Sequence, residues 1–480
     1  MKVDKTAYER MKVKENKVLS NRDAWRLRYH LMPPTGWLND PNGLCQHKGI
    51  YHIYYQYSPD DVEGKTKLWG HYTSKDMLHF REHEPVLYED TRYDARGVYS
   101  GSAFVKDDVI HYFYTGNYKL EGDYDYIYSG REHNTMHVSS KDGFVMSEKV
   151  RLLANSDYPS DMSCHVRDPK ILEVDGSYYM VLGARDKADC GCVLLYESND
   201  LLDWHYVMRI QCEEPFGYMW ECPDLFELDG QFFLVICPQG VPQQGYNYAN
   251  VYQNGYFPIT IDFKKKTYTL GEFHELDRGF DFYAPQSFVD ETGRRILIPW
   301  MGLPDIDYTN PTVKYHWQHA LGMPRVLKRQ KDRILQSPME EMKHLRKEGI
   351  HTTMENWNEM AIKETVFEFC MKVSKQEDID ICLRGQTHLC YDAQSKVCTL
   401  VMGEDGYGRT TRSVQLNSLD NLQIFSDTSS LEIFINDGAE CFTTRIYSTK
   451  DARITIEKAP AATEIAYYPL TGYCIEEDVK

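Results

Sequence analysis

Three carboxylates of this chain lie in closely similar local sequences. Asp40 lies in WLNDPNG, Asp168 in RDPK and Glu221 in WECPD. In each case a proline follows the acid within two residues, and a strand-like run begins about ten residues further on. Acids that recur at one position of a repeat are brought together by any fold that stacks its repeats around an axis. We therefore predict that these three acids form one active site.

Two carboxylates with different pKa values are the minimal apparatus for glycoside hydrolysis, one as nucleophile or base and the other as general acid. Asp40 has asparagines on either side, whose amides can keep a carboxylate ionised. Glu221 follows the run YMW, an apolar setting that is expected to raise its pKa and keep it protonated. Arg167 precedes Asp168 and favours its charged form. The 36 tyrosines of the chain mostly serve strand packing, although aromatic rings also line sugar sites.

The acids belong to a repeat. Strand-like cores begin near Tyr51, Ile110, Tyr178, Phe232 and Ile296, roughly sixty residues apart. A unit of this length can supply four short strands, which is typical of a β-propeller blade. An irregular sandwich could also produce so loose a period. The same phase recurs five times, however, and this favours a five-bladed β-propeller.

The hydrophobic pattern of the sequence divides the whole chain into four regions. Residues 1–30 are expected to form a helical or irregular lead-in, and residues 31–337 the propeller. The run PMEEMKHLRKEGI predicts a helical linker over 338–351. Alternating strands then return, so residues 352–480 are predicted to form a β-sandwich. Its clearest signal is a hairpin over 430–447, turned by Asn-Asp-Gly.

Composition excludes several classes of partner. The 480-residue chain has a formal net charge of −18 and dispersed basic residues, which argues against a nucleic-acid partner. No apolar run approaches the length of a membrane helix, and the first 25 residues lack the apolar core of a secretory signal. The 13 cysteines show neither a disulfide framework nor zinc-ligand spacing. We expect reduced thiols, a cytoplasmic location and no metal, with homo-oligomerisation left open.

Further motifs accompany the three acids in order along the chain, from roughly residue 25 to 450. With them the chain resembles glycoside hydrolase family 32, the β-fructofuranosidases, which include invertases, inulinases, levanases and bacterial sucrose-6-phosphate hydrolases. The motifs that carry the resemblance are WLNDPNG (37–43), YYQY (54–57), WGH (69–71), YSGS (99–102), RDP (167–169), ECP (221–223), FDFYAPQ (280–286) and EIFINDG (432–438).

The resemblance implies a propeller followed by a sandwich and a retaining mechanism without cofactor. In it Asp40 is the nucleophile, Glu221 the acid/base and Asp168 the stabiliser of the transition state. Phe80 replaces the usual tryptophan, and Ser58 replaces the asparagine of a common Asn-Pro pair, so only subsite details are affected. The residues implied to bind the sugar are Asn39, Gln56, Trp69, Tyr99, Ser100, Arg167, Tyr283 and Trp300.

The sequence leaves the substrate open between sucrose, sucrose 6-phosphate and short fructooligosaccharides. A fructosyltransferase would use the same acids, whereas a non-catalytic sugar-binding propeller would be expected to have lost one of them. The stretch 118–134 is expected to shape the leaving-group side. A phosphate site needs cationic groups near the acids. The candidates for it are Arg131, His133, Lys314 and His316, each more typically an ordinary solvated side chain.

Overall fold

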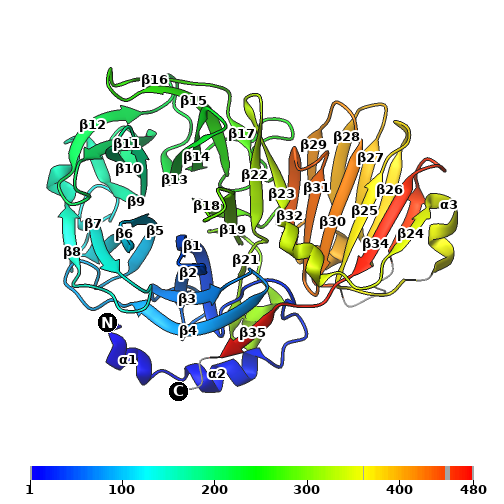
Figure 1. The fold of residues 1–480 in the computed structure, drawn as a ribbon, viewed down its shortest axis with the longest axis horizontal. Helices are drawn as coiled ribbons and strands as arrows, with labels where there is room; N and C mark the ends of the chain where they lie inside the picture. Colours follow the sequence, from blue (N-terminus) through cyan, green and yellow to red (C-terminus); the bar gives the residue numbers. More distant parts are fainter. Residues whose placement is uncertain (1–2, 361, 449–453, 478–480) are drawn as a thin grey trace.

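The computed structural model describes residues 3–360, 362–448 and 454–477. Five sheets surround a common axis, and two further sheets pack face to face beside them (Figure 1). The chain is therefore all-β, a five-bladed β-propeller followed by a C-terminal β-sandwich, as the sequence predicted.

Each blade is an antiparallel sheet that runs outward from the axis. The innermost strands contact one another in a ring. The strand-like runs that revealed the repeat are the second strands of the blades, and the acids lie on the strand before them. Blade 1 contains β1 (Gly36–His47), β2 (Ile50–Ser58), β3 (Leu68–Ser74) and β4 (His79–Leu87); blade 2 contains β5 (Val98–Lys106), β6 (Val109–Lys119), β7 (Arg131–Ser140) and β8 (Val150–Leu153); blade 3 contains β9 (Met162–Val174), β10 (Ser177–Asp186), β11 (Gly191–Ser198) and β12 (His205–Ile210).

Blades 4 and 5 complete the ring. Between β19 and β22 the chain forms two short strands: β20 (Trp317–Gln318) pairs in parallel with β1 and so joins the sheet of blade 1, whereas β21 pairs with β19 within blade 5. Blade 4 contains β13 (Met219–Leu228), β14 (Gln231–Gln239), β15 (Gly255–Asp262), β16 (Thr267–Leu270) and β17 (His274–Glu275); blade 5 contains β18 (Tyr283–Val289), β19 (Arg295–Met301), β21 (Ala320–Leu321), β22 (Arg325–Gln330) and β23 (Arg333–Pro338).

Every innermost strand carries a β-bulge at the same place. In blade 1, Leu38 opposes Tyr57 while Pro41 opposes Tyr55, so three steps on one strand match two on the other. The same extra residue occurs in all five blades, and it re-aims the side chains around it. The bulged segments are 38–41, 98–101, 167–170, 221–224 and 283–286.

The bulges explain the prolines of the sequence pattern. Proline has no backbone N–H, so within a sheet it is confined to edge strands and bulges. Pro41, Pro169, Pro223 and Pro285 all lie in bulges of innermost strands, where one edge of the sheet faces the axis. An acid followed closely by proline in the sequence therefore marks the position of a bulge.

The sandwich follows a short connection that differs from the predicted helix. Within 338–351 the chain forms a 3-10 helix, η3 (Glu340–Leu345), and then enters β24 (Ile350–Thr353), which already belongs to a sandwich sheet. The predicted hairpin is confirmed: β31 pairs with β32 across Asn436 and Asp437, both with positive φ. The sandwich contains β24, β25 (Phe367–Lys372), β30 (Asn421–Asp427), β31 (Ser430–Ile435), β32 (Glu440–Arg445) and β34 (Glu464–Pro469) in one sheet and β26 (Ile379–Arg384), β27 (Thr387–Asp392), β28 (Val397–Val401), β29 (Thr411–Gln415) and β33 (Thr455–Lys458) in the other.

The two ends of the described chain meet on blade 1. The lead-in forms α1 (Lys5–Glu9) and α2 (Val13–Ser20), and β35 (Cys474–Glu477) pairs in parallel with β4 (Figure 1). The prediction that 352–480 would be sandwich is therefore wrong for β35, which extends a propeller blade. A third short helix, α3 (Met354–Trp357), packs against the sandwich, and none of the described helices has the length and apolar character needed to cross a membrane.

Buried ion pairs join the propeller to the sandwich. Arg325, which is completely buried, pairs with Asp277 at 3.1 Å and with Glu432 of β31 at 2.6 Å. Arg409, also completely buried, pairs with Asp281 at 2.6 Å. Breaking such a pair would leave an uncompensated buried charge, so the contact resists separation. The sandwich thereby braces the segment that leads into β18.

Candidate active site

The three acids come together at the end of the axis where the innermost strands begin, which we call the carboxylate end. Cys222 connects them: its N–H donates to Asp168 Oδ2 at 2.9 Å, and its Sγ lies 3.7 Å from Asp40 Oδ2. Arg167 donates through Nε to Glu221 Oε1 at 3.1 Å and lies 3.9 Å from Asp168 Oδ2. Acids from blades 1, 3 and 4 thus face one small region.

The acids occupy successive places in equivalent bulges. Glu221 immediately precedes its bulge, Asp168 is the first bulged residue and Asp40 the second. We predicted that the three acids occupy the same position of the repeat. They do lie at equivalent bulges, but their positions within the bulge differ by one or two residues. Asp168 has φ of 61° and Cys222 of 48°, a left-handed conformation that is costly for residues other than glycine. Such backbone strain is concentrated at functional sites.

Asp40 is held by two donors. Ser100 donates to its Oδ2, and Asn39 Nδ2 donates to its Oδ1 at 3.0 Å. Asn39 is itself fixed by Gln56, whose Oε1 accepts at 3.1 Å, and by Lys67 Nζ, which donates to its Oδ1 at 2.8 Å. Burial raises the pKa of Asp40, and the hydrogen bonds from Ser100 and Asn39 oppose that rise. Asn39 hydrogen-bonds the carboxylate as predicted, whereas Asn42 does not, because its Oδ1 accepts from the Gly101 N–H at 3.2 Å and its Nδ2 has no partner among the described residues; Ser100 provides the second contact instead.

Asp168 is the most deeply buried of the acids. Its N–H donates to Thr115 Oγ1 at 2.9 Å, which ties the bulge of blade 3 to blade 2. Burial raises the pKa of Asp168 to about 7, although Arg167 acts in the opposite direction. We predicted from Arg167 alone that this acid would be ionised. Burial outweighs the guanidinium, because Arg167 lies nearer to Glu221 than to Asp168.

The surroundings of Glu221 are polar, contrary to prediction. Gln239 Nε2 and the Tyr283 hydroxyl each donate to Oε2 at 2.7 Å, and Arg167 binds Oε1. The apolar neighbour Trp220 points the other way, into the core between blades 3 and 4. Adjacent side chains of a strand alternate between faces, so the local run YMW does not describe what the glutamate contacts.

Five of the predicted sugar-binding side chains lie around the acids: Asn39, Gln56, Ser100, Arg167 and Tyr283. Tyr99 lies beside them and is partly exposed. The two tryptophans do not face the site. Trp69 is completely buried and donates to the Tyr99 carbonyl at 3.2 Å, while Trp300 is 2% exposed and packs between Trp37 and Tyr283. Both support the residues that line the site.

Sequence reasoning missed several contributors. Lys67 reaches the site from just before β3, Thr115 from β6, and Gln239 from the end of β14. Trp37 donates through its indole N–H to Asn39 Oδ1 at 2.8 Å. Only Trp37 had a usable signal, since it begins the WLNDPNG motif. The others depend on strand register, which the sequence does not reveal.

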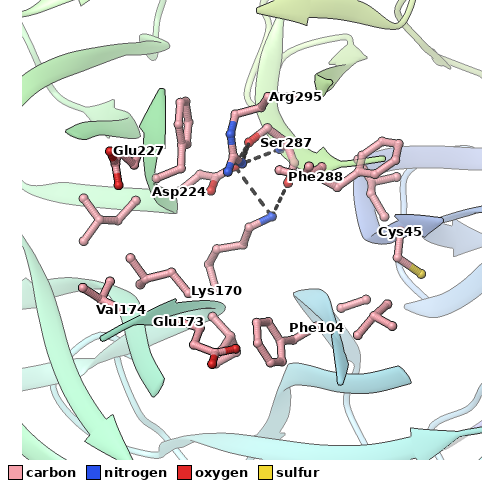
Figure 2. Close-up of a pocket in the computed structure, with 18 of the residues that line it drawn as sticks. Cys45, Phe104, Lys170, Glu173, Val174, Asp224, Glu227, Ser287, Phe288 and Arg295 are labelled. Carbon is pink, nitrogen blue, oxygen red and sulfur yellow. Dashed lines mark hydrogen bonds and ion pairs between the residues drawn. The ribbon is translucent and has the colours of Figure 1, made fainter. Parts of the chain in front are cut away.

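A cavity of about 510 Å³ lies at the opposite end of the same strands, which we call the far end. Lys170 enters it from β9 and bonds the Ser287 carbonyl, with Asp224 Oδ2 3.6 Å away (Figure 2). Arg295 donates to Ser287 Oγ at 3.0 Å and stacks on Phe226. None of the three acids lines this cavity. The acids and this cavity therefore lie at opposite ends of the propeller.

The residues considered for a phosphate site separate into two groups. Lys314 is exposed and His316 Nε2 lies 3.0 Å from Asn16 Nδ2 of α2, on the outside of the ring. Arg131 and His133 instead lie near the acids, since both are neighbours of His165 and Tyr99. Only the second group could contact a sugar held by the acids.

Models of known families match almost the whole chain. The model "Glycosyl hydrolases family 32 N-terminal domain" covers residues 30–338, and "Glycosyl hydrolases family 32 C terminal" covers residues 328–466. The chain is 37% identical over 453 residues to a sucrose-6-phosphate hydrolase of Bacillus subtilis, covering 92% of each. It is 36% identical over 452 residues to a raffinose invertase of Escherichia coli, covering 90% of this chain and 91% of that one.

Solved structures of similar proteins have the same fold as this chain. A sucrose-6-phosphate hydrolase from Lactobacillus gasseri superposes with a TM-score of 0.88 at 27% identity, covering 96% of each chain. A β-fructofuranosidase of this family from Bombyx mori, a variant solved with sucrose, gives 0.84 at 26% identity, covering 98% of this chain and all of the other.

Proposed function

Because the chain belongs to glycoside hydrolase family 32, we propose that this glycosidase releases terminal β-D-fructofuranosyl units from sucrose, sucrose 6-phosphate or short fructooligosaccharides. The observation that carries the proposal is the convergence of Asp40, Asp168 and Glu221, each with a different set of partners. The reaction proceeds through a covalent fructosyl intermediate with retention of configuration.

Asp40 is the nucleophile. Its carboxylate is held from both sides by Ser100 and Asn39, so its orientation is set before the sugar arrives. The hydrogen bonds favour the ionised form that attack requires. An oxygen of Asp40 forms the bond to the anomeric carbon as the bond to the leaving oxygen breaks. Water later displaces the carboxylate and regenerates it.

Glu221 is the acid/base. It must protonate the leaving oxygen in the first step and take a proton from water in the second. Tyr283 and Gln239 hold Oε2, and Arg167 holds Oε1. Arg167 also faces Asp168, so a fructosyl hydroxyl bound between these two draws the guanidinium away from Glu221. This movement of the guanidinium frees Oε1 of Glu221 to face the leaving oxygen.

Asp168 stabilises the transition state. Its raised pKa reflects a buried carboxyl with few donors, and sugar hydroxyls would supply those donors. Ionisation of Asp168 on binding places negative charge beside the oxocarbenium-like centre, where it is most stabilising. Asp168 therefore couples recognition of the fructosyl unit to the chemical step.

The proposed location is the cytoplasm. All thirteen cysteines lie in the described part of the chain and none is disulfide-bonded. Most are buried as small apolar side chains, and burial raises the pKa of several, including Cys222 and Cys237, which keeps them inert thiols. Such usage is typical of a reducing compartment.

The test is an initial-rate measurement of fructose release from sucrose and sucrose 6-phosphate, with Asp40→Asn as the matched variant. We expect the substitution to lower kcat by at least about 10³-fold without changing the thermal midpoint by more than a few degrees. With methanol as acceptor, the methyl fructofuranoside formed should keep the β configuration, which NMR resolves. An inverted product, or equal inactivity of both proteins on every β-fructoside, would contradict the proposal.

A further inference from the structure

A chain of nitrogen groups runs outward from Glu221. Arg167 Nη1 contacts His165 Nδ1, and His165 Nε2 lies 3.1 Å from Arg131 Nη1. The guanidinium of Arg131 is therefore separated from that of Arg167 by the imidazole ring of His165. Arg131 opens β7 directly opposite Lys119 of β6. A cationic cluster, which we define as Arg131 and Lys119, thus lies beside the acid/base.

Arg131 cannot obtain an acceptor from His165. Burial and the two guanidinium groups lower the pKa of His165 to about 2, so the ring is neutral and has one N–H and one lone pair. Nδ1 faces Arg167, which can only donate, so Nδ1 is the acceptor. Nε2 then carries the hydrogen, and its partner is the Tyr126 carbonyl at 3.1 Å. Arg131 Nη1 consequently faces an N–H.

No protein anion replaces the missing acceptor. Within the described residues no carboxylate forms an ion pair with Arg131 or Lys119, and Arg131 Nε is buried without any hydrogen-bond partner. Glu132, the next residue of β7, pairs instead with Arg92 at 3.4 Å. Asp125, in the preceding loop, is exposed and accepts from the backbone N–H of its own turn. An unpaired, partly buried guanidinium is a ready anion site.

Among the described residues, the groups around the cluster add further cations and no carboxylate, so the amine of Lys119 is held close to other positive charges. Burial lowers the pKa of Lys119, and the charges of Arg131 and Arg96 lower it further. His133 is completely buried beside Tyr99, both of its ring nitrogens lack partners, and burial holds its pKa well below the usual range. These groups offer cations and neutral donors but no negative charge.

The cluster also lies at the correct end of the propeller. β5 begins at Val98, which pairs with Gly116, and the pairing of β6 with β7 continues three residues beyond that point to Lys119 and Arg131. The cluster therefore projects past the start of the innermost strands, at the carboxylate end. In the proposed function the fructosyl unit binds at Asp40 and Asp168. The leaving sugar then lies on the side of Glu221, in the direction of Arg167 and, beyond it, Arg131.

We propose that Arg131, assisted by Lys119, binds the phosphate monoester of a phosphorylated leaving sugar. This inference rests on the proposed function, because it assumes that Glu221 protonates the leaving group. A phosphate supplies acceptor oxygens that match the planar donors of arginine, and a second cation completes neutralisation of the dianion. Among the substrates left open by the sequence, the structure therefore selects the phosphorylated disaccharide over sucrose and neutral fructooligosaccharides.

The experiment compares kcat/KM for sucrose 6-phosphate and sucrose in the wild type, Arg131→Gln, Lys119→Gln and a control, Arg151→Gln. Arg151 is an exposed arginine on the outer strand of the same blade, where it stacks on Tyr93. For Arg131→Gln we expect kcat/KM on the phosphorylated sugar to fall about 10- to 100-fold, mainly through KM, with less than a 3-fold change on sucrose. Lys119→Gln should show a smaller loss of the same kind, and the control should change neither value.

Binding to an inactive protein separates this inference from the proposed function. In Asp40→Asn, calorimetry should detect glucose 6-phosphate binding that the added Arg131→Gln change abolishes, whereas glucose binds weakly to both. Equal losses on both substrates would mean that Arg131 only positions Arg167 through His165, and would overturn the phosphate site. Unchanged kinetics in Arg131→Gln, or a wild type that favours sucrose, would overturn it as well. Inactivity of the wild type on both sugars would instead contradict the proposed function.

Discussion

The two ends of the propeller axis are built from the same five strands but treat buried charge in opposite ways. At the far end, Lys170 and Asp224 lie close together and Arg295 stacks on Phe226, so the charges are matched and walled by apolar side chains. At the carboxylate end, three acids share essentially one guanidinium, Arg167. The charges of the far end are therefore paired, whereas at the carboxylate end the acids outnumber the guanidinium that contacts them, and the cationic cluster of Arg131 and Lys119 lies apart from the acids without a carboxylate of its own in the described part of the chain.

The bulge separates these two environments. Before and within it, strained backbone aims side chains at the axis, and after it the strands resume regular pairing. Lys170 comes only two residues after Asp168, and Asp224 only three after Glu221. A few ångströms along a strand therefore separate a group that performs chemistry from a group that holds blades together. Variants on either side of the bulge should have opposite phenotypes.

The largest effect is expected at Glu221. Glu221→Gln keeps the size and the acceptor for Tyr283 but removes the transferable proton, so kcat should fall about 10²- to 10⁴-fold. Thermal unfolding should change little, because the amide can still bond Tyr283. A kcat close to the wild-type value would exclude Glu221 as the acid/base.

Lys170→Met should produce the reverse outcome. The substitution leaves Asp224 buried beside an apolar side chain, which should cost about 3–5 kcal/mol of unfolding free energy, measured by denaturant titration. Activity per folded molecule should stay within about 3-fold of the wild type. The double variant with Asp224→Asn should recover most of the stability, because it removes the stranded charge. A stable but inactive Lys170→Met would show that the far end takes part in catalysis.

Asp168→Asn should gain stability at the cost of activity. The pKa of Asp168 is about 7 in the folded protein, above the value of an unfolded aspartate near 4, so the folded state binds more protons between these limits. Wild-type stability contributed by this group is thus lost as the pH rises from about 4 to about 7. The variant has no carboxyl here and does not lose this stability. The difference in unfolding free energy between Asp168→Asn and the wild type should therefore be about 2–4 kcal/mol more in favour of the variant at pH 8 than at pH 4. A constant difference between the two proteins across this range would argue against a raised pKa.

The sequence predicted the fold and the acids because both appear in a repeated local pattern. A proline in the bulge, an acid next to it and a hydrophobic second strand recur along the chain, and each is a local consequence of the blade. The environment of Glu221 was misjudged for the same reason: its neighbours in sequence face the core, and its partners come from β14 and β18. Partners across strands depend on register, which local patterns do not carry.

The tryptophans illustrate a second limit. Trp69 and Trp300 occur in motifs close to the site, yet both are buried behind the residues that line it. A motif identifies which residues are near the chemistry but does not say whether a ring faces the ligand or supports a neighbour. Arg131 shows the converse. The phosphate-binding role proposed for Arg131 depends on His165, whose Nε2 carries a hydrogen and so cannot accept a hydrogen bond from Arg131. Only the arrangement of the side chains in space reveals this.

The pairing of β35 with β4 has a consequence for synthesis of the protein. β35 follows β4 by roughly 390 residues, so at about 5–20 residues per second the outer edge of blade 1 stays unpaired for roughly 20 to 80 s on the ribosome. An open strand edge invites pairing with another nascent chain. β4 reads HFREHEPVL, with alternating charges and a proline, the residues that make an edge a poor template. The strand that waits longest for its partner thus has a composition that resists pairing with another chain during the delay.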